Sequence, residues 1–402
     1  MKIMLIVPEY PPYNIGGGGI VYENLALNLN KFGHKVTVIW GYYPSSSIFE
    51  KITQEEINGI KFFRVPEIPY LKSKPFLRTA MPPNISGLIS LPKIIKKEKP
   101  DLIHLHGYGL PYITFCSIIS HLLNIHYLFT IHGYPKTPEI NKVFRIIWNI
   151  YDKTLMKSAL HHSKKITCVS KWIAEDERLD CFQDKVKVIY NGINQGKFLN
   201  KKKNNDINIY KKFHLSENSQ LICSVGRISK MKGFHMVINI LPKLLNDFPD
   251  VYYFIIGADD GYKRRLEQIA GEKGIKNRII FTGFIDEVIK NKIIKESDVF
   301  IVPSLWEPFG LTALEGLALE KIVITSGEGG LKEFLSDCKN VLFYDQNDDA
   351  SIVTAIKKVL NGEKKYQHDT YLQTFNWEHI VQEYVQVYDQ IGMNKKYKKV
   401  IK

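Results

Sequence analysis

Short apolar runs rich in β-branched and aromatic residues alternate with longer amphipathic stretches along almost the whole chain. The short runs have the length of buried strands, and the stretches between them have the period of helices. Strands that alternate with helices in this way form parallel sheets with helices on their faces. The first series of expected strands occupies residues 3–7, 35–40, 101–106, 127–131, 166–170 and 186–190, with a helix over 21–32 that Gly33 ends.

The composition changes at residues 200–212, which are rich in lysine and asparagine and poor in apolar side chains. A second series of expected strands follows at residues 221–225, 251–256, 278–282, 298–302 and 322–325, with closing helices over 351–361 and 377–391. A length of 402 residues suits two domains better than one. We therefore expect two Rossmann-like doubly wound α/β domains over 1–200 and 213–375, joined by a linker over 201–212, and a closing helix with a basic tail over 376–402. Because ligands of open parallel sheets bind at the carboxyl ends of the strands, two such domains facing each other would line a central cleft.

Composition excludes several classes of protein. Apolar residues make up 45% of the chain, which is enough to build full cores. The five cysteines are scattered and contain no C-x-x-C pair, which argues against a disulfide framework and a structural zinc site. The apolar run at 3–7 is too short for a signal peptide, and no run reaches the roughly 20 apolar residues of a membrane-spanning helix. We expect a soluble, cytoplasmic protein.

The formal net charge of +14 favours anionic partners, such as nucleic acid, acidic lipid or phosphorylated small molecules. No nucleic-acid-binding module is recognisable and no basic stripe is interleaved with aromatic residues, so we expect no nucleic acid partner. Two segments, 82–99 and 142–165, combine basic with large apolar side chains, as helices that lie on an anionic membrane surface do. Helices that pack on the sheet and show their lysines to water explain both segments equally well.

The segment 303–315 places Glu307 in a loop after an expected strand and Glu315 in the helix that follows. The backbone N–H groups of residues 309–311 would lie at the helix start, where unpaired donors and the helix dipole attract phosphate. Two carboxylates beside a phosphate site suit a sugar nucleotide, which has hydroxyl groups at both ends and phosphates between them. In a structural alternative, Glu315 closes a capping box that begins at Thr312, and Glu307 is a solvated loop acid.

Glycines and cations follow the first expected strand of each domain. Residues 16–19 are four glycines between a strand and a helix, where backbone N–H groups can approach a phosphate or a sugar closely. Their order is no dinucleotide fingerprint, and a flexible turn is the simpler explanation. In the second domain Arg227 and Lys232 follow the strand, and a guanidinium with an ammonium suits a diphosphate, although both side chains could be ordinary surface cations.

Three histidines, His104, His106 and His132, end two consecutive expected strands. A metal site needs convergent ligands at a suitable spacing, and the sequence shows no such set. A lone histidine is more often structural, and we assign that role to His104.

Taken together, these motifs resemble the retaining glycosyltransferases of the glycosyltransferase family 4 type (glycosyl transferases group 1). Two glutamates separated by seven residues are the signature of this family, and the Pro-Phe-Gly-Leu stretch 308–311 and Ala-Leu-Glu-Gly stretch 313–316 are similar to it too. Arg227 and Lys232 match its Gly-Arg and Lys-Gly pairs. The resemblance covers nearly the whole chain. One departure is Leu-Glu-Lys at 319–321, where the family has Gly-x-Pro, which puts the local backbone geometry in doubt.

The resemblance implies the GT-B fold, with an acceptor-side first domain and a nucleotide-sugar-binding second domain. Glu315 would bind the ribose hydroxyls, and Glu307 would bind sugar hydroxyls near the anomeric carbon. The implied catalytic residues are Glu307, His132, Arg227 and Lys232. The implied donor-binding residues are Gly17, Gly18, Arg227, Lys232, Phe309, Gly310, Leu311 and Glu315. His106 would lie on the acceptor side.

The implied reaction moves a sugar from a nucleoside diphosphate sugar to an acceptor hydroxyl with the anomeric configuration kept, in cell-surface polysaccharide or glycolipid synthesis. The chain has no Asp-x-Asp motif, with which many sugar-nucleotide transferases hold a metal ion, so we expect neither metal nor cofactor. We expect a UDP- or GDP-sugar donor, a saccharide or lipid-linked acceptor, and a cytoplasmic location that extends to the inner membrane surface if the basic segments bind lipid. Two other hypotheses stay open: a sugar-nucleotide epimerase, and a sugar-nucleotide-binding protein without catalysis.

Overall fold

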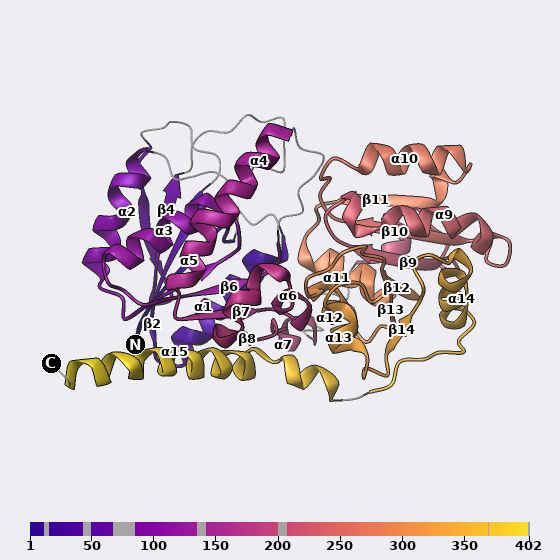
Figure 1. The fold of residues 1–402 in the computed structure, drawn as a ribbon. Coiled ribbons are helices and arrows are strands. Elements are labelled where there is room, and N and C mark those ends of the chain that lie inside the picture. The colour runs from indigo at the N-terminus through magenta and orange to yellow at the C-terminus, as the bar shows by residue number, and fades with distance from the viewer. Residues whose placement is uncertain are drawn as a thin grey trace. The chain divides into compact units, whose positions relative to one another are not determined.

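The computed structural model describes residues 1–11, 16–42, 50–66, 85–134, 142–199, 207–368 and 370–400. They form two compact units, each built on a sheet flanked by helices (Figure 1). The first unit combines Met1–Gly192 with the C-terminal segment Trp377–Lys402, and the second is Ile193–Asn376. The expected fold class, two doubly wound α/β domains, is confirmed.

The first unit contains an eight-stranded sheet in the order β3-β4-β2-β1-β5-β6-β7-β8. Neighbouring strands are parallel except for β3 and β4, which form an antiparallel hairpin at one edge. The strands are β1 (Lys2–Val7), β2 (Lys35–Tyr42), β3 (Thr53–Ile57), β4 (Ile60–Pro66), β5 (Leu102–His106), β6 (Tyr127–Ile131), β7 (Lys165–Cys168) and β8 (Val186–Val188).

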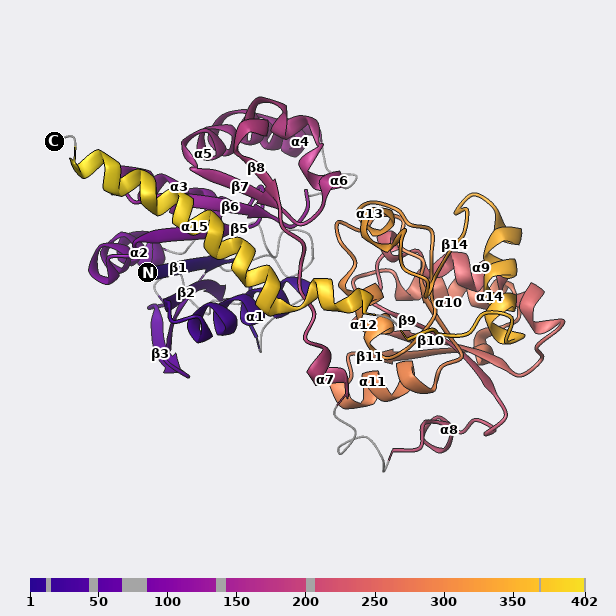
Figure 2. The ribbon, with the colours of Figure 1, turned by 90° about the horizontal axis from the view of Figure 1, so that it is seen from below.

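Helices cover this sheet, and Figure 2 shows the C-terminal helix running along the first unit next to its N-terminal helix. The helices are α1 (Gly17–Lys31), α2 (Ile85–Glu98), α3 (Pro111–Leu122), α4 (Lys142–Tyr151), a π-helix (Asp152–Met156), α5 (Lys157–His162), α6 (Lys171–Ala174), a 3₁₀ helix (Glu177–Lys185) and α15 (Trp377–Val400). In α15 the buried residues Val381, Tyr384, Tyr388 and Ile391 recur with a helical period, which gives the helix an apolar face for the first unit. Each helix in the described part of the chain is too short or too polar to span a lipid bilayer.

The β3–β4 hairpin lies outside the expected alternation of buried strands. Strand β3, Thr-Gln-Glu-Glu-Ile, is almost wholly exposed and so has no apolar pattern. The turn residues Asn58 and Gly59 have φ angles of 53° and 76°. A two-residue hairpin turn with positive φ at both positions strongly prefers Asn-Gly, so this pair is a signal for the hairpin in the sequence. The turn residues therefore predict the hairpin better than the strands do.

The second unit contains a six-stranded parallel sheet in the order β11-β10-β9-β12-β13-β14. The strands are β9 (Gln220–Val225), β10 (Val251–Ile256), β11 (Ile279–Gly283), β12 (Val299–Val302), β13 (Val323–Thr325) and β14 (Val341–Phe343). The longer helices are α9 (Phe234–Leu245), α10 (Lys263–Glu272), α11 (Glu287–Glu296), α12 (Leu311–Ala318) and α14 (Asp349–Leu360). The shorter ones are α7 (Gln195–Leu199), α8 (Ile209–Lys212), α13 (Leu331–Leu335) and 3₁₀ helices over Lys230–Lys232, Lys276–Arg278 and Tyr371–Phe375. All four residues of β12 are buried, as expected for a parallel sheet covered on both faces.

The chain passes from one unit to the other after Gly192 and again before Trp377. At the first crossing, a Cβ on Gly192 would lie 2.7 Å from the Trp377 ring, so the two residues pack in direct contact. Beside it, the Ile193 N–H donates to the Phe375 carbonyl oxygen over 2.7 Å. These contacts mark the boundary between the two units at 192/193. Of the expected linker, 201–212, the first half, 201–206, lies outside the described residues.

The order of the strands reverses once in each sheet. In the first unit the chain runs outward from β1 and then continues on its other side with β5, and in the second unit β9 and β12 are related in the same way. Open parallel sheets bind ligands beyond the carboxyl ends of their strands at such points. The loops after β1, β5, β9 and β12 are therefore the places where a site is expected.

Candidate functional site

A lysine and a glutamate meet beyond the carboxyl ends of β9 and β12. Lys232 ends the 3₁₀ helix after β9, and Glu307 lies in the loop after β12. Lys232 Nζ donates to Glu307 Oε2 over 2.5 Å, and Ser304 Oγ donates to the same oxygen over 3.2 Å. Glu307 is only 9% exposed, so its charge is held by these partners and not by bulk water. The interpretation of Glu307 as a solvated loop acid is wrong.

Backbone packing that only glycine permits holds these loops together. Gly233, with a φ of 67°, lies so close to the Pro303 carbonyl oxygen that a Cβ would overlap it. A Cβ on Gly329 would overlap the Glu307 carbonyl oxygen in the same way. That oxygen also accepts a hydrogen bond from the Gly330 N–H over 2.8 Å. The position of the Lys232–Glu307 pair is therefore set by three segments that are far apart in the sequence.

Arg227 lies two residues after the end of β9, in the same loop as Lys232. Its Nη1 donates to Asp260 Oδ2 over 3.1 Å, and half of its side chain is exposed. Asp260 lies in the loop after β10, which is joined to the Arg227 loop by a hydrogen bond from the Ile228 N–H to the Ala258 carbonyl oxygen. A salt bridge this exposed contributes little to stability, so an incoming phosphate can replace Asp260 at low cost.

Glu315 forms a second ion pair, with a partner on a different helix. Its Oε2 accepts a hydrogen bond from Lys290 Nζ of α11 over 2.9 Å, and both side chains are largely buried. Helix α12 starts at Leu311, and its N-cap residue is Gly310, which has a φ of 102° and offers no side chain to the helix start. The capping-box interpretation of Thr312 and Glu315 is therefore wrong, and the carboxylate is held elsewhere.

The side chain of Phe309 belongs to the core of the second unit. It is 3% exposed and its ring stacks on Phe334, with ring centroids 4.5 Å apart and planes inclined by 19°. Phe309 can therefore contribute only backbone groups to a ligand, as Gly310 and Leu311 do at the start of α12. Its ring anchors the loop that carries Glu307.

In the first unit, the glycine loop meets a carboxylate at the start of α1. Gly17 is the first residue of the helix, and the Gly19 N–H donates to Glu9 Oε1 over 3.1 Å. A Cβ on Gly18 would lie 3.1 Å from the same oxygen and 3.2 Å from the Tyr22 hydroxyl. An anionic group thus already occupies this helix start, as expected where N–H groups and the helix dipole are unopposed.

His106 and His132 are brought together at the ends of β5 and β6. His106 Nδ1 lies 3.0 Å from His132 Nε2, and the Tyr22 ring packs against both imidazoles, with centroids 4.9 and 5.2 Å away. His106 is fully buried, whereas His132 is partly exposed. The glycine loop, Tyr22 and the two histidines therefore form one continuous group at the carboxyl edge of the first sheet.

His104 lies deeper in the same row and has the structural role expected of it. Its Nδ1 lies 2.8 Å from the Tyr388 hydroxyl of α15, and its Nε2 lies 2.6 Å from Thr130 Oγ1 of β6. These bonds tie the C-terminal helix to the centre of the sheet. Both ring nitrogens are satisfied, as a buried imidazole requires.

Burial keeps this row of imidazoles neutral. It lowers the pKa of His132 to about 4, and it lowers the pKa of His106 and of His104 well below the usual value, with the neighbouring rings adding to the effect. The charged form of a group is disfavoured where water is excluded. Among the residues that the structure describes, no three His, Cys, Asp or Glu side chains are placed to hold a metal ion.

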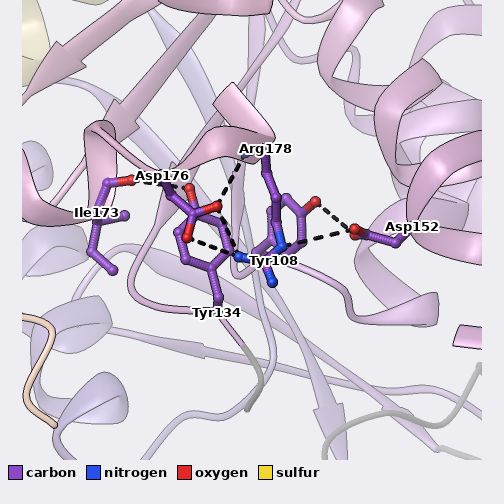
Figure 3. Close-up of polar contacts among 6 residues, drawn as sticks. All are labelled: Tyr108, Tyr134, Asp152, Ile173, Asp176 and Arg178. Carbon is purple, nitrogen blue, oxygen red and sulfur yellow. Dashed lines mark hydrogen bonds and ion pairs between the residues drawn. The ribbon is translucent and has the colours of Figure 1, made fainter. Parts of the chain in front are cut away.

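Two residues after His106 and His132, in the loops beyond β5 and β6, Tyr108 and Tyr134 belong to the polar cluster of Figure 3. The rings of Tyr108 and Tyr134 meet edge to face at 4.9 Å, and Arg178 lies over the Tyr134 ring, with Cζ 4.7 Å from its centroid. Arg178 Nη1 donates to both Asp176 oxygens over 2.8 Å, and the Tyr108 hydroxyl donates to Asp152 Oδ1 over 2.6 Å. Asp152 begins the π-helix that continues α4, so the cluster fixes α4 to the strand ends near the histidines.

Three residues next to these groups were not singled out from the sequence. Tyr22 lies one turn after the glycines, within the expected first helix, and that spacing is the signal that points to it. Asp260 is one of two adjacent aspartates in a loop, and Lys290 is one of several lysines on α11. The latter two have no distinguishing pattern, because only the packing of the sheet brings them to Arg227 and Glu315.

Comparisons with known proteins show the family and the fold of the chain. A family model described as Glycosyltransferase Family 4 matches residues 15–197, and one described as Glycosyl transferases group 1 matches residues 206–371. Together the two matches span most of both units.

Individual proteins match over nearly the full length. An uncharacterized glycosyltransferase of Methanocaldococcus jannaschii is 29% identical, over 96% of this chain and 98% of its own. The GPI3 subunit of phosphatidylinositol N-acetylglucosaminyltransferase from Saccharomyces cerevisiae is 22% identical, over 95% of this chain and 81% of its own. The structure of Anabaena HepE in complex with UDP aligns with a TM-score of 0.69 at 17% identity, over 97% of this chain and 100% of that one. The chain therefore belongs to the family 4 type of glycosyltransferases (glycosyl transferases group 1) and is a transferase with the GT-B fold.

Proposed function

We propose that this enzyme transfers a sugar from a nucleoside diphosphate sugar to an acceptor hydroxyl with retention of the anomeric configuration. The observation that carries the proposal is the partly buried Lys232–Glu307 pair beyond the carboxyl ends of β9 and β12. An ammonium group suits a phosphate, and a carboxylate suits sugar hydroxyls. The pair places an ammonium group and a carboxylate side by side beyond β9 and β12, where the strand order reverses and where ligands of such sheets bind.

The leaving nucleoside diphosphate gains negative charge as the bond to the sugar breaks. Preplaced cations and N–H donors stabilise that charge more strongly in the transition state than in the ground state. Lys232, Arg227 and the backbone N–H groups of Gly310 and Leu311 are the donors that we assign to this task. Arg227 would exchange Asp260 for a phosphate oxygen when the donor binds.

We assign the ribose hydroxyls of the donor to Glu315. Its carboxylate is held by Lys290 through one oxygen, Oε2, which leaves Oε1 to accept from a ribose hydroxyl. HepE, which shares the fold, binds UDP in its solved structure, and this supports a nucleoside diphosphate as the ligand of this chain. A UDP- or GDP-sugar remains the proposed donor.

Glu307 orients the donor sugar in this mechanism. The bonds from Lys232 and Ser304 to its Oε2 hold the carboxylate in place, where its Oε1 would accept from a sugar hydroxyl. In a front-face reaction the bond between the anomeric carbon and the phosphate oxygen breaks. The acceptor oxygen bonds to the same face, and its proton passes to the departing phosphate. His132 would lie beside the reacting sugar, Gly17 and Gly18 beside the diphosphate, and His106 towards the acceptor.

The reaction is proposed to need no metal ion. Fixed cations supply the charge that a bound divalent ion supplies in transferases with an Asp-x-Asp motif, and this chain lacks that motif. Full activity in excess EDTA supports this part of the proposal. Loss of activity in EDTA that Mn²⁺ or Mg²⁺ restores would contradict it.

Helix α4 is the proposed contact with a membrane that carries the acceptor. Ile146, Ile147 and Ile150 lie on one face of α4 and are each more than half exposed, and Lys153 and Lys157 are exposed just beyond it. Apolar side chains flanked by lysines suit an anionic lipid surface. The GPI3 relative acts on phosphatidylinositol by its name, which supports a lipid-linked acceptor here. The other expected segment, 82–99, begins outside the described residues and continues as α2.

Flotation with liposomes tests this contact. We expect binding to vesicles that contain anionic lipid, and loss of binding for Ile147→Ser/Ile150→Ser. The control is Ile57→Ser, which removes an equally exposed isoleucine from the edge hairpin. Equal flotation of both variants, or binding to neutral vesicles alone, would contradict the role of α4.

The reaction itself is tested with a panel of UDP-, GDP- and ADP-sugars and candidate saccharide and lipid acceptors. We expect nucleotide release that depends on the acceptor, with a product of retained configuration. A converted sugar nucleotide without acceptor would show an epimerase instead. Tight binding without turnover for every donor and acceptor would show a binding protein.

A further inference from the structure

We propose that His106 fixes the tautomer of His132, so that His132 presents an Nδ1–H donor at the ligand edge of the first sheet. In this arrangement His132 donates a hydrogen bond to the substrate and takes no proton from it. His106 is a positioning residue, because it acts through His132. The proposal rests on the proposed function in one respect: the partner of the Nδ1–H is taken to be the sugar nucleotide or its acceptor.

The two imidazoles are placed for one well-formed hydrogen bond. Strands β5 and β6 are parallel, with His106 opposite Thr130, and His132 lies two residues beyond that pair. His106 Nδ1 and His132 Nε2 are 3.0 Å apart, and the ring planes are inclined by only 27°. The N–H of one ring therefore points close to the lone pair of the other.

The environment of His106 decides which ring donates. Its second nitrogen, Nε2, is buried and has no hydrogen-bond partner among the residues that the structure describes. If His132 donated, His106 would carry its single proton on Nε2, as a buried N–H without acceptor. Orphaned buried N–H groups are rare because their desolvation is uncompensated. With His106 as the donor, its proton lies in the bond and Nε2 carries none.

The proton of His132 must then lie on its other nitrogen. Both rings are neutral because burial lowers their pKa, and a neutral imidazole carries one proton. His132 Nδ1 is not among the buried atoms that lack a hydrogen-bond partner, and the residue is partly exposed, so an N–H at this position is not an orphaned buried donor. Among the described residues, the rings of Tyr22 of α1 and His104 of β5 pack on the pair, and both are neutral. Glu9 is the acidic group that acts on Tyr22, whereas the lowered pKa values of His106 and His132 arise from burial and from neighbouring imidazoles.

Nuclear magnetic resonance of the full chain labelled with ¹⁵N in histidine reads the tautomer directly. The long-range ¹H–¹⁵N pattern of His132, assigned by comparison with His132→Asn, distinguishes a protonated Nδ1 from a protonated Nε2. We expect the Nδ1–H form in the unliganded wild-type protein at neutral pH. An Nε2–H form would overturn the proposal, and this measurement needs neither a known substrate nor a folded His106 variant.

Two variants of similar shape test the consequence for catalysis. Asparagine places an amide N–H near the position of His106 Nδ1, whereas leucine has the same branching and no donor. We expect His106→Leu to lower kcat about tenfold, as loss of one hydrogen bond does, with a smaller change in the donor KM. His106→Asn should restore most of the rate. Wild-type kcat in His106→Leu, or equal losses in both variants when both are folded, would overturn the positioning role.

The outcomes separate this proposal from the proposed function. If the wild-type protein has the Nδ1–H form of His132 but transfers no sugar, the tautomer assignment is correct and the proposed reaction is wrong. If it transfers a sugar but His132 carries its proton on Nε2, the reaction is correct and the tautomer assignment is wrong.

Discussion

Lys232 and Glu307 are 75 positions apart in the sequence, yet Lys232 Nζ and Glu307 Oε2 are 2.5 Å apart beyond the central strands of the second unit. The strand order explains the meeting, because β9 and β12 are neighbours although β10 and β11 lie between them in the sequence. The largely buried carboxylate needs the ammonium, and the ammonium is held ready for a phosphate. Stability and the proposed activity therefore rest on the same two side chains.

Removing one partner of this pair should harm both properties. We expect Lys232→Met to lower turnover at least about 100-fold, because the charge of the leaving group loses a fixed cation. The free energy of unfolding should also fall, by about 2 kcal/mol, because Glu307 is left largely buried without its partner. Urea denaturation and steady-state kinetics measure the two effects.

The double variant Lys232→Met/Glu307→Gln separates them. It removes both charges, so stability should return towards the wild-type value while turnover stays low. Lys230→Met removes an exposed lysine from the same 3₁₀ helix and serves as the matched control. Normal turnover in folded Lys232→Met would rule out the assigned role.

Lys290 should control affinity for the donor through Glu315. Lys290→Met leaves the Glu315 carboxylate without the ammonium that orients it, so we expect the donor KM to rise about tenfold with a smaller change in kcat. Lys290→Arg keeps a cation at this position and should recover most of the affinity. The control is Lys292→Met on the same helix, where the lysine pairs with Glu296. A donor KM that is unchanged in Lys290→Met would show that the pair is only structural.

The buried imidazoles should make the first unit acid-sensitive. The folded-state pKa of His132 is about 4, below the unfolded value of about 6.5, so the unfolded state binds more protons between these pH values. The contribution of such an imidazole to the free energy of unfolding is therefore fully present above pH 6.5. It falls as the pH drops, by about 1.4 kcal/mol per pH unit for each imidazole. Urea denaturation at intervals from pH 7.5 to 5 measures this slope. The slope should be smaller in His132→Leu, whereas an unchanged slope would show that His132 titrates normally in the fold.

Glu320 marks the departure from the family pattern, and its backbone shows the consequence. It has a φ of 60°, in the left-handed region that side chains other than glycine rarely adopt. Glu320→Gly should therefore raise the free energy of unfolding by up to about 1 kcal/mol. The same change at Glu267, inside α10, should instead cost about 1 kcal/mol. Thermal unfolding compares the two, and destabilisation by Glu320→Gly would show that its contacts outweigh the strain.

The two doubly wound sheets were predictable because their central strands are buried on both faces and leave uninterrupted apolar runs in the sequence. The exposed strand β3 leaves no such run, and only the Asn58-Gly59 turn indicates it. The boundary at Gly192 depends on its contact with Trp377, which no local composition reveals. The same limit holds for long-range partners in the site.

Glu307 and Lys232 were predicted individually from their motifs, but their direct contact was not. Nor did the sequence indicate that Glu315 pairs with Lys290, since helix periodicity says which face a lysine occupies and not which element packs there. The histidines were placed at strand ends, where they lie, yet the bond between His106 and His132 follows from the register of β5 and β6. Register and strand order therefore carry the part of the site that motifs leave open.

A crystal structure of the full chain soaked with UDP or GDP tests the central claim most directly. We predict that the diphosphate contacts Lys232, Arg227 and the start of α12, and that the ribose hydroxyls contact Glu315. A nucleotide that is bound elsewhere, with the Lys232–Glu307 and Lys290–Glu315 pairs untouched, would contradict the account.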